Sequence, residues 1–373
     1  MSATSVTLNE SLWLRSKKWD LIWITGSVIL VTVPYASYYA GMAIGLNPDT
    51  SRNAINMLVA FLIGGPHMYA THLRSTLDPS FRERHRSIYI AALIIPGLVI
   101  YFGYYHFVFL LSFFFMWASI HVLHQIIYLV DCYNGRDGRG KQSSNVFFGV
   151  KSGWIDYAVV LTALYPVAMY RFVHGTFKVG VNTLFFPEFL KFDAVWWMAS
   201  AMFAAALTLY IMKTWREFLS GEGNVPKTAL IGVTVIASFI TPIFHELDVA
   251  FQGMNTWHSF QYLGLTWFIN RLRYERNELP KKLRLFSRPG RWWKYYGFTV
   301  IANIFALGSI GTLLLTRAQT GLSFDQCYYI VVLCFLLTHY YHDHIIFRER
   351  ANFSPAGNTA KLSRADVVLS PQT

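Results

Sequence analysis

Long apolar stretches, separated by short polar segments, constrain the fold of this protein more than any other feature of its sequence. A helix that crosses a bilayer needs roughly 20 apolar residues, because the hydrocarbon interior holds no water to satisfy the backbone. Hydrophobic residues make up 54% of the 373 residues and charged residues only 14%, whereas a soluble domain carries about 25% charged residues. The sequence therefore predicts an all-α fold, a polytopic integral membrane helical bundle with about ten transmembrane helices.

The expected membrane-spanning helices all belong to one domain over residues 1–373, with a polar N-terminal leader and a polar C-terminal tail. We expect the helices at residues 21–46, 54–71, 88–105, 107–130, 154–170, 195–213, 229–244, 249–269, 296–315 and 324–347. The leader contains no short apolar core with a small-residue cleavage site, so we expect no signal peptide to be removed.

Lysine and arginine collect in alternate loops, which indicates the cytoplasmic side of the membrane. The segment from Arg271 to Lys294 alone holds nine basic residues, and the leader and the loops after the second and fourth spans are basic as well. We therefore expect both termini to be cytoplasmic. The net charge of +12 is spread over these loops, so we expect contact with anionic membrane lipids and no nucleic-acid partner.

Nine of the twelve histidines lie in or beside the apolar stretches. Imidazole is costly to bury in hydrocarbon without a partner, so ionisable residues there are candidates for function. The candidate metal ligands are His67, His72, His121, His124, His245, His258, His339, His342 and His344. His67 and His72 follow Gly64–Pro66, a step that we expect to kink the second span. The tandem histidines predict a metal centre inside the bundle.

The spacing of the later histidines matches helical geometry. His121 and His124 are three residues apart, as are His339 and His342, and side chains at this spacing lie on one side of a helix. We expect the histidine pairs to converge near the cytoplasmic side. Carboxylates and amides nearby would orient the imidazole N–H groups. The candidates for this role are Asp131, Gln125, Gln261 and Asp343.

Three short motifs resemble those of the membrane-bound histidine-box non-haem iron oxygenases, the group of lipid desaturases and hydroxylases. HMYATH at residues 67–72 looks like the first histidine box, and HVLHQ at 121–125 and HYYHDH at 339–344 look like the later boxes. Gln125 and Asp343 stand where those boxes have an adjacent second histidine. GGPH at residues 64–67 is similar, more faintly, to the membrane carotene-cleaving oxygenases. The resemblance implies an oxygenase that uses O2 on a lipid or isoprenoid substrate.

The histidine ligands do not identify the metal, because imidazole binds zinc, copper and iron alike. An apolar setting with few hydrolytic groups favours O2-dependent oxidation of a water-insoluble substrate, and zinc would suit hydrolysis better. We therefore expect one or two non-haem iron ions, ahead of zinc or copper. The expected partners are a hydrophobic small-molecule substrate, membrane lipids and an electron donor protein.

Two other functions fit the same histidines. A haem-bearing quinol or electron-transfer membrane protein would use histidines of facing helices as axial ligands, and a proton-coupled transporter would use histidines and carboxylates as a proton relay. Tandem spacing favours compact metal clusters over haem. The sequence has one convincing helix break, at Gly64–Pro66, rather than the paired broken helices of many transporters.

Overall fold

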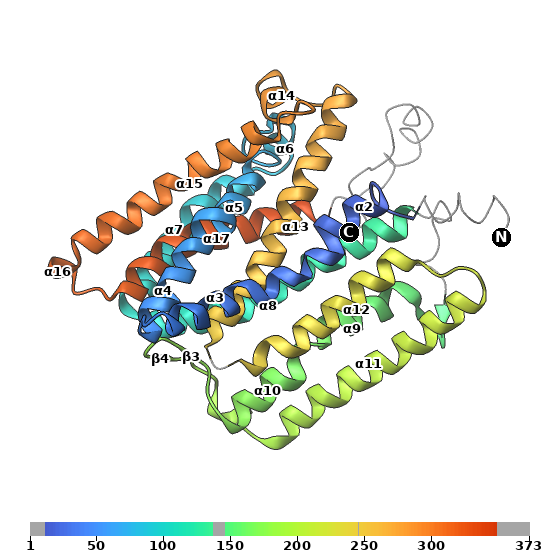
Figure 1. Ribbon diagram of the computed structural model, residues 1–373, viewed down its shortest axis with the longest axis horizontal. Coiled ribbons are helices and arrows are strands. Elements are labelled where there is room, and N and C mark those ends of the chain that lie inside the picture. Colours follow the sequence, from blue (N-terminus) through green and yellow to red (C-terminus); the bar gives the residue numbers. More distant parts are fainter. Residues whose placement is uncertain (1–11, 137–145, 245, 349–373) are drawn as a thin grey trace.

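Helices dominate the computed structural model, which describes residues 12–136, 146–244 and 246–348 (Figure 1). The first part contains α2 (Lys17–Asp20), the π-helical turn η1 (Leu21–Thr25), the 3-10 segment η2 (Gly26–Val31), α3 (Thr32–Ala43), α4 (Pro48–Val59), the π-helical turn η3 (Ala60–Gly64), α5 (Gly65–His72), α6 (Pro79–Arg84), α7 (Ser87–Tyr105) and α8 (Phe107–Arg136). The middle part contains α9 (Ser152–Thr162), α10 (Tyr165–His174), η5 (Glu188–Leu190), α11 (Asp193–Leu219), α12 (Val225–Ile240) and η6 (Thr241–Ile243). The last part contains α13 (Leu247–Glu275), α14 (Lys281–Ser287), α15 (Trp292–Leu315), α16 (Arg317–Thr320) and α17 (Phe324–Ile346).

Two short antiparallel hairpins complete the described secondary structure. β1 (Val146–Phe147) pairs with β2 (Val150–Lys151), and β3 (Lys178–Val179) pairs with β4 (Asn182–Thr183). The two residues that link β1 to β2 both have positive φ, as the tight turns of two-residue hairpins require.

Seven helical segments of the described chain are long and apolar enough to cross a membrane, so the fold is an all-α bundle compatible with membrane insertion. They are Lys17–Ala43, Pro48–His72, Ser87–Tyr105, Phe107–Arg136, Asp193–Leu219, Val225–Ile243 and Trp292–Leu315. The number of about ten is not confirmed. The span expected at residues 154–170 is divided into α9 and α10. The helices α13 and α17 are long, but the histidines and carboxylates that they carry reduce their apolar character.

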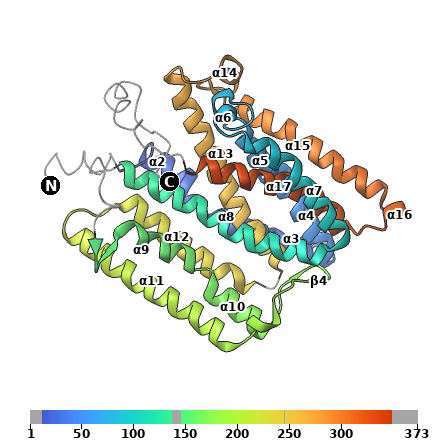
Figure 2. The same ribbon diagram turned by 180° about the vertical axis from the view of Figure 1, so that it is seen from behind.

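Helix α13 is the centre of the bundle, and most of its side chains are buried. It contacts η2, α3, α4, α5, α8 and α14. Figure 1 shows α9 to α12 on one side of the molecule and α5, α7, α15 and α17 on the other. Seen from behind in Figure 2, α8 runs between these two groups. A Cβ atom on Gly253 would lie 2.3 Å from the Val31 carbonyl oxygen, so glycine permits this close approach of η2 to α13.

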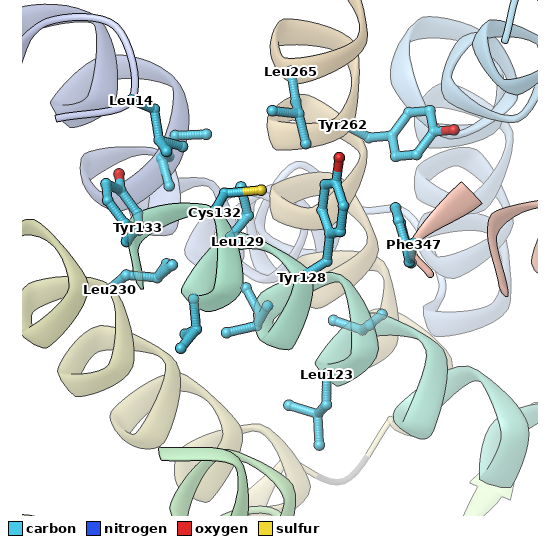
Figure 3. Packing of buried hydrophobic residues seen from close by; sticks show 14 of the residues in the cluster. Leu14, Leu123, Tyr128, Leu129, Cys132, Tyr133, Leu230, Tyr262, Leu265 and Phe347 are labelled. Atoms are coloured by element: carbon cyan, nitrogen blue, oxygen red, sulfur yellow. The ribbon is translucent and has the colours of Figure 1, made fainter. Parts of the chain in front are cut away.

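Large buried side chains fill the space where α8 meets α13. Figure 3 shows Tyr128 and Leu129 of α8 near Leu265 of α13, with Phe347 beyond the end of α17. The rings of Tyr128 and Phe347 are stacked, with centroids 4.9 Å apart. Such packing stabilises the contact between helices through many small van der Waals attractions.

A buried ion cluster joins the first turns of α4, α13 and α17. Nη1 of Arg52 lies 2.9 Å from Oδ2 of Asp248 and 3.1 Å from Oδ1 of Asp325. Asn56 donates a hydrogen bond to Asp248 at 3.1 Å. Breaking a buried pair leaves an uncompensated charge, at a cost of about 3–5 kcal/mol. The cluster therefore holds three helices at fixed relative positions.

The kink expected in the second span is the π-helical turn η3, which runs directly into α5. Pro66 has no N–H, so the carbonyl of Leu62 loses its helical donor. Tyr296 of α15 donates its hydroxyl to that carbonyl instead. Asn303, also on α15, donates to the Ala60 carbonyl at 2.8 Å. Helix α15 thus satisfies the backbone that the turn exposes, and such turns occur frequently at functional sites.

Candidate metal centre

Four histidines meet inside the bundle, one from each of four helices. They are His67 of α5, His121 of α8, His258 of α13 and His339 of α17, each at most 5% exposed. Ring centroids are 4.6 Å apart for His67 and His339 and 5.2 Å apart for His67 and His258. The ring of His121 is 5.0 Å from that of His258 and 5.3 Å from that of His339. The four imidazoles therefore form one compact cluster.

A carboxylate, Asp343 of α17, completes two overlapping groups of possible ligands. His67, His258 and His339 form one group, His121, His339 and Asp343 form the other, and the ligand atoms within each group lie within 4.8 Å of one another. Two nitrogens bound on opposite sides of an ion at 2.1 Å would lie about 4.2 Å apart. Both groups are thus near the spacing that a metal ion requires, and His339 belongs to both.

Several polar atoms in the cluster have no hydrogen-bond partner among the described residues. They are Nε2 of His67, His121 and His339, both ring nitrogens of His258, and Oδ2 of Asp343. An unpaired buried polar group costs about 1–3 kcal/mol, so several in one place require an explanation. A bound cation would provide one, since these atoms are all possible metal ligands.

The other nitrogen of His339 is held by Thr71 of α5. The Thr71 hydroxyl lies 2.7 Å from Nδ1 of His339 and donates to Oδ1 of Asp343 at 3.1 Å. A hydroxyl has one hydrogen, so Thr71 accepts from Nδ1–H and leaves Nε2 without a proton, the form that binds metals. Tyr262 of α13 also donates to Oδ1 of Asp343, at 2.7 Å. Oδ2 therefore remains available to the cluster.

Ser259 holds the Nδ1 nitrogen of His67 in the way that Thr71 holds that of His339. Its hydroxyl lies 2.8 Å from Nδ1 of His67 and donates to the side-chain oxygen of Asn255 at 3.2 Å. The hydrogen that Ser259 gives to Asn255 is unavailable to His67, so Nδ1 of His67 is the donor and Nε2 carries a free lone pair. Two of the four histidines are thus oriented with Nε2 as the potential ligand, as in many metal sites.

The expected convergence of whole histidine pairs is not what the structure shows, because each pair is divided. His72 and His342 lie beside each other outside the cluster, with ring centroids 5.5 Å apart. Nδ1 of His72 hydrogen-bonds to Thr76 at 2.7 Å, and Nδ1 of His342 lies 3.2 Å from the Ser75 hydroxyl. His72 follows His67 by five residues, which turns its side chain about 140° around α5 and away from the cluster.

His124 and His344 form a separate pair, with ring centroids 5.7 Å apart. His124 follows His121 by three residues, about 60° around α8, and His344 follows His339 by five residues, about 140° around α17. In α17 it is Asp343, four residues after His339, that faces the cluster. His245, also expected as a ligand, lies outside the described residues.

The amides and carboxylates expected to orient the histidines have other partners in three of the four cases. Gln125 donates to the backbone carbonyl of His258 and to the side chain of Gln261, which in turn donates to the carbonyl of Ile24. Asp131 accepts a hydrogen bond from Tyr157 of α9. It lies seven residues beyond His124, about 10 Å along the helix and too far for direct contact. Asp343 does lie at the cluster, as a possible ligand itself.

Sequence reasoning did not single out Thr71 and Ser259 as the residues that orient the histidines. Thr71 comes four residues after His67, on the same face of α5, and Ser259 comes directly after His258. A hydroxyl residue near a candidate histidine could have been predicted to orient an imidazole, because histidine ligands usually donate their second N–H to a polar neighbour.

Comparisons with protein-family models, with curated proteins and with solved structures found no match to this chain. The resemblance of the histidine motifs to those of iron oxygenases therefore stays a prediction.

Proposed function

We propose that this protein is a membrane-embedded non-haem iron oxygenase that uses O2 to hydroxylate, desaturate or cleave a lipid or isoprenoid substrate. The observation that carries the proposal is the group of His121, His339 and Asp343, with unpaired ligand atoms in a buried site. Two histidines and one carboxylate with open positions are the ligand set of many non-haem Fe(II) oxygenases. His67 and His258 would complete the site on the opposite side of His339.

The chemistry that iron supplies when bound is the activation of O2 beside an apolar substrate. The residues of the chain hold and orient the ligands. Thr71 and Ser259 keep Nε2 of His339 and His67 unprotonated, and Tyr262 fixes the Asp343 carboxylate. The surrounding buried side chains keep bulk water away from the site, which suits a water-insoluble substrate.

The same geometry favours a small ion over haem and over zinc. Four imidazole rings in mutual contact leave no space for a flat macrocycle between any two of them. The three histidines His67, His258 and His339 would also suit catalytic zinc, but the additional carboxylate of Asp343 favours iron.

We further propose an integral membrane location with both termini in the cytoplasm. The basic segments around α6 and α14 lie at the same end of the bundle (Figure 1). Arg273, at the end of α13, forms an ion pair with Asp78, before α6, at 2.6 Å. Basic residues gathered at one end support cytoplasmic placement of that end.

Product analysis under ¹⁸O2 tests the proposed activity. Purified protein reconstituted with a total lipid extract, ferrous iron and a chemical reductant should yield lipids that contain ¹⁸O, or lipids that have lost two hydrogens if it is a desaturase. The His339→Ala variant should lose at least 100-fold of this product, because both ligand groups include His339. His85, at the end of α6, belongs to neither ligand group. His85→Ala is therefore the control and should retain the product. Iron-loaded wild-type protein that forms neither product would contradict the proposal.

A further inference from the structure

An apolar groove runs along the flank of the bundle between α7, α8 and α17, with a volume of about 800 Å³. Sites for small organic ligands have volumes of about 300–1,000 Å³. Leu98 and Phe102 of α7 face Phe109 and Trp117 of α8 across this groove. Leu98 is 52% exposed and Phe109 is 50% exposed, so the groove is open at its side. In a bilayer, this opening would face the lipid tails.

His121 belongs both to the groove and to the histidine cluster. Its ring stacks on Tyr340, with centroids 3.8 Å apart, and both residues line the groove. Along α8 the groove extends from Phe109 to Ile127. His121 lies twelve residues after Phe109, which corresponds to about 18 Å along the helix. Most of the apolar part of the groove therefore lies on one side of the candidate metal centre.

The other end of the groove carries polar side chains beside the apolar Ile127 and Leu161. His124 follows His121 by about one helical turn, and it lines the groove together with Tyr341 and His344. Arg348 is exposed, and its Nη2 lies 2.7 Å from Nε2 of His344. Guanidinium and imidazole groups at the end of an apolar channel match an anionic head attached to a long apolar chain, since arginine binds carboxylates with particular strength.

We propose that this groove binds a single-chain lipid or isoprenoid acid. Its carboxylate lies against His124, His344 and Arg348, and its tail extends toward Phe102 and Phe109. His124 is only one helical turn, about 5 Å, from His121, so the carbons nearest the carboxylate lie beside the metal centre. This last point rests on the proposed function, and the binding of the acid does not.

Photolabelling maps both the site and the direction of the bound molecule. The probes are two palmitic acid analogues, one with a diazirine near the carboxylate and one with a diazirine near the methyl end, added to the protein in phosphatidylcholine nanodiscs. The first should label peptides around His124 and His344, and the second should label peptides around Leu98 and Phe109. The reverse pattern would overturn the proposal, as would equal labelling of α11, a largely exposed apolar helix outside the groove.

Variants and competitors test the chemistry of the head and of the groove. Arg348→Gln should reduce labelling by the acids at least 5-fold and leave labelling by the matching alcohol unchanged. An alcohol that labels wild-type protein as strongly as the acid would contradict the anionic head. Leu98→Trp should block the methyl-end label, whereas Ile301→Trp, on the exposed face of α15, should not.

The His339→Ala variant separates this inference from the proposed function. His339 belongs to both groups of possible ligands but does not line the groove. The variant should lose metal and still be labelled by both acids. If the wild-type protein is labelled as expected but contains no iron, the result would contradict the oxygenase and leave the acid-binding groove supported. Iron-loaded wild-type protein that is labelled only at random would contradict the groove.

Discussion

At the scale of single residues, the candidate centre depends on which nitrogen of each histidine faces inward. Thr71 and Ser259 decide this for His339 and His67, because each hydroxyl uses its only hydrogen elsewhere. Replacing either hydroxyl would allow the imidazole to rotate or to place its proton on Nε2.

We therefore predict that Thr71→Val and Ser259→Ala each weaken iron binding by about 10–100-fold, the usual effect of losing a partner that orients a ligand. Titration of the metal-free protein with ferrous iron measures this. Ser309→Ala removes an exposed hydroxyl from α15 that bonds only within its own helix, so it serves as the control. Affinity equal to the wild type in both site variants would show that these hydroxyls do not orient ligands.

At the scale of the helices, the sequence predicted which segments carry candidate ligands but not which of these residues would meet. The positions of His121 and His339 on their helices follow from the sequence pattern, and both reach the cluster. His124 and His342 were expected beside them and point elsewhere, because the rotation of each helix is set by packing with its neighbours. Asn303 donates a hydrogen bond to the Ala60 carbonyl in the turn before α5. The two residues are 243 positions apart, so nothing in the sequence around either one predicts this contact.

Close contact between α5 and α15 leads to a second prediction. A Cβ atom on Gly65 would lie 2.1 Å from Oδ1 of Asn303, whereas a Cβ on Gly308, also on α15, would meet nothing within 4 Å. Gly65→Ala should therefore displace α15, lower the thermal unfolding temperature by several degrees and reduce the iron content. Gly308→Ala should behave as wild type in the same thermal assay and metal analysis. Equal behaviour of the two variants would contradict this role of Gly65.

The link between α13 and α6 makes stability depend on pH. Burial alone would raise the pKa of Asp78, but hydrogen bonds and charge attraction from Arg273, with hydrogen bonds from Ser80, lower the pKa below its usual value. The carboxylate therefore stabilises the fold above the unfolded-state pKa of about 3.9, and this stabilisation is lost as the pH falls through the lower pKa of the folded state.

Asp78→Asn should keep the cap of α6, because asparagine is an equally good N-cap, and lose the ion pair. We expect a loss on the order of 1 kcal/mol at neutral pH that disappears in acid, measured by thermal unfolding across pH. Arg273→Gln should give the same loss, and the double variant should give no more. If the stability difference between Asp78→Asn and the wild type stays unchanged at low pH, the ion pair with Arg273 cannot be its cause.

At the scale of the whole molecule, a helical bundle compatible with membrane insertion was predictable and the number of candidate spans was not. Helices with no ionisable residue in their middle, such as α7 and α15, stand out by apolar length alone. Helices α13 and α17 do not, because polar side chains lower their apolar character: His258 and several amides in α13, and His339, His342, Asp343 and His344 in α17. In these two helices, residues of the candidate site thus make the span harder to recognise by apolar length, whereas His67 and His121 lie in segments that are still apolar enough.

The positions of the basic segments predict that tags at the two termini are both accessible from the cytoplasmic side. Sealed right-side-out and inverted vesicles, treated with protease, measure this. Cleavage of both tags only in inverted vesicles is the expected result, and cleavage on opposite sides would require an odd number of crossings.

Elemental analysis of the purified protein, combined with its optical spectrum, tests the central claim most directly. The protein should contain one or two iron ions per chain without a haem Soret band, as expected for a ligand set of two histidines and one carboxylate. His339→Ala should lose most of this iron, and His85→Ala should retain it. Stoichiometric haem, zinc in place of iron, or unchanged iron in the His339→Ala variant would contradict the account.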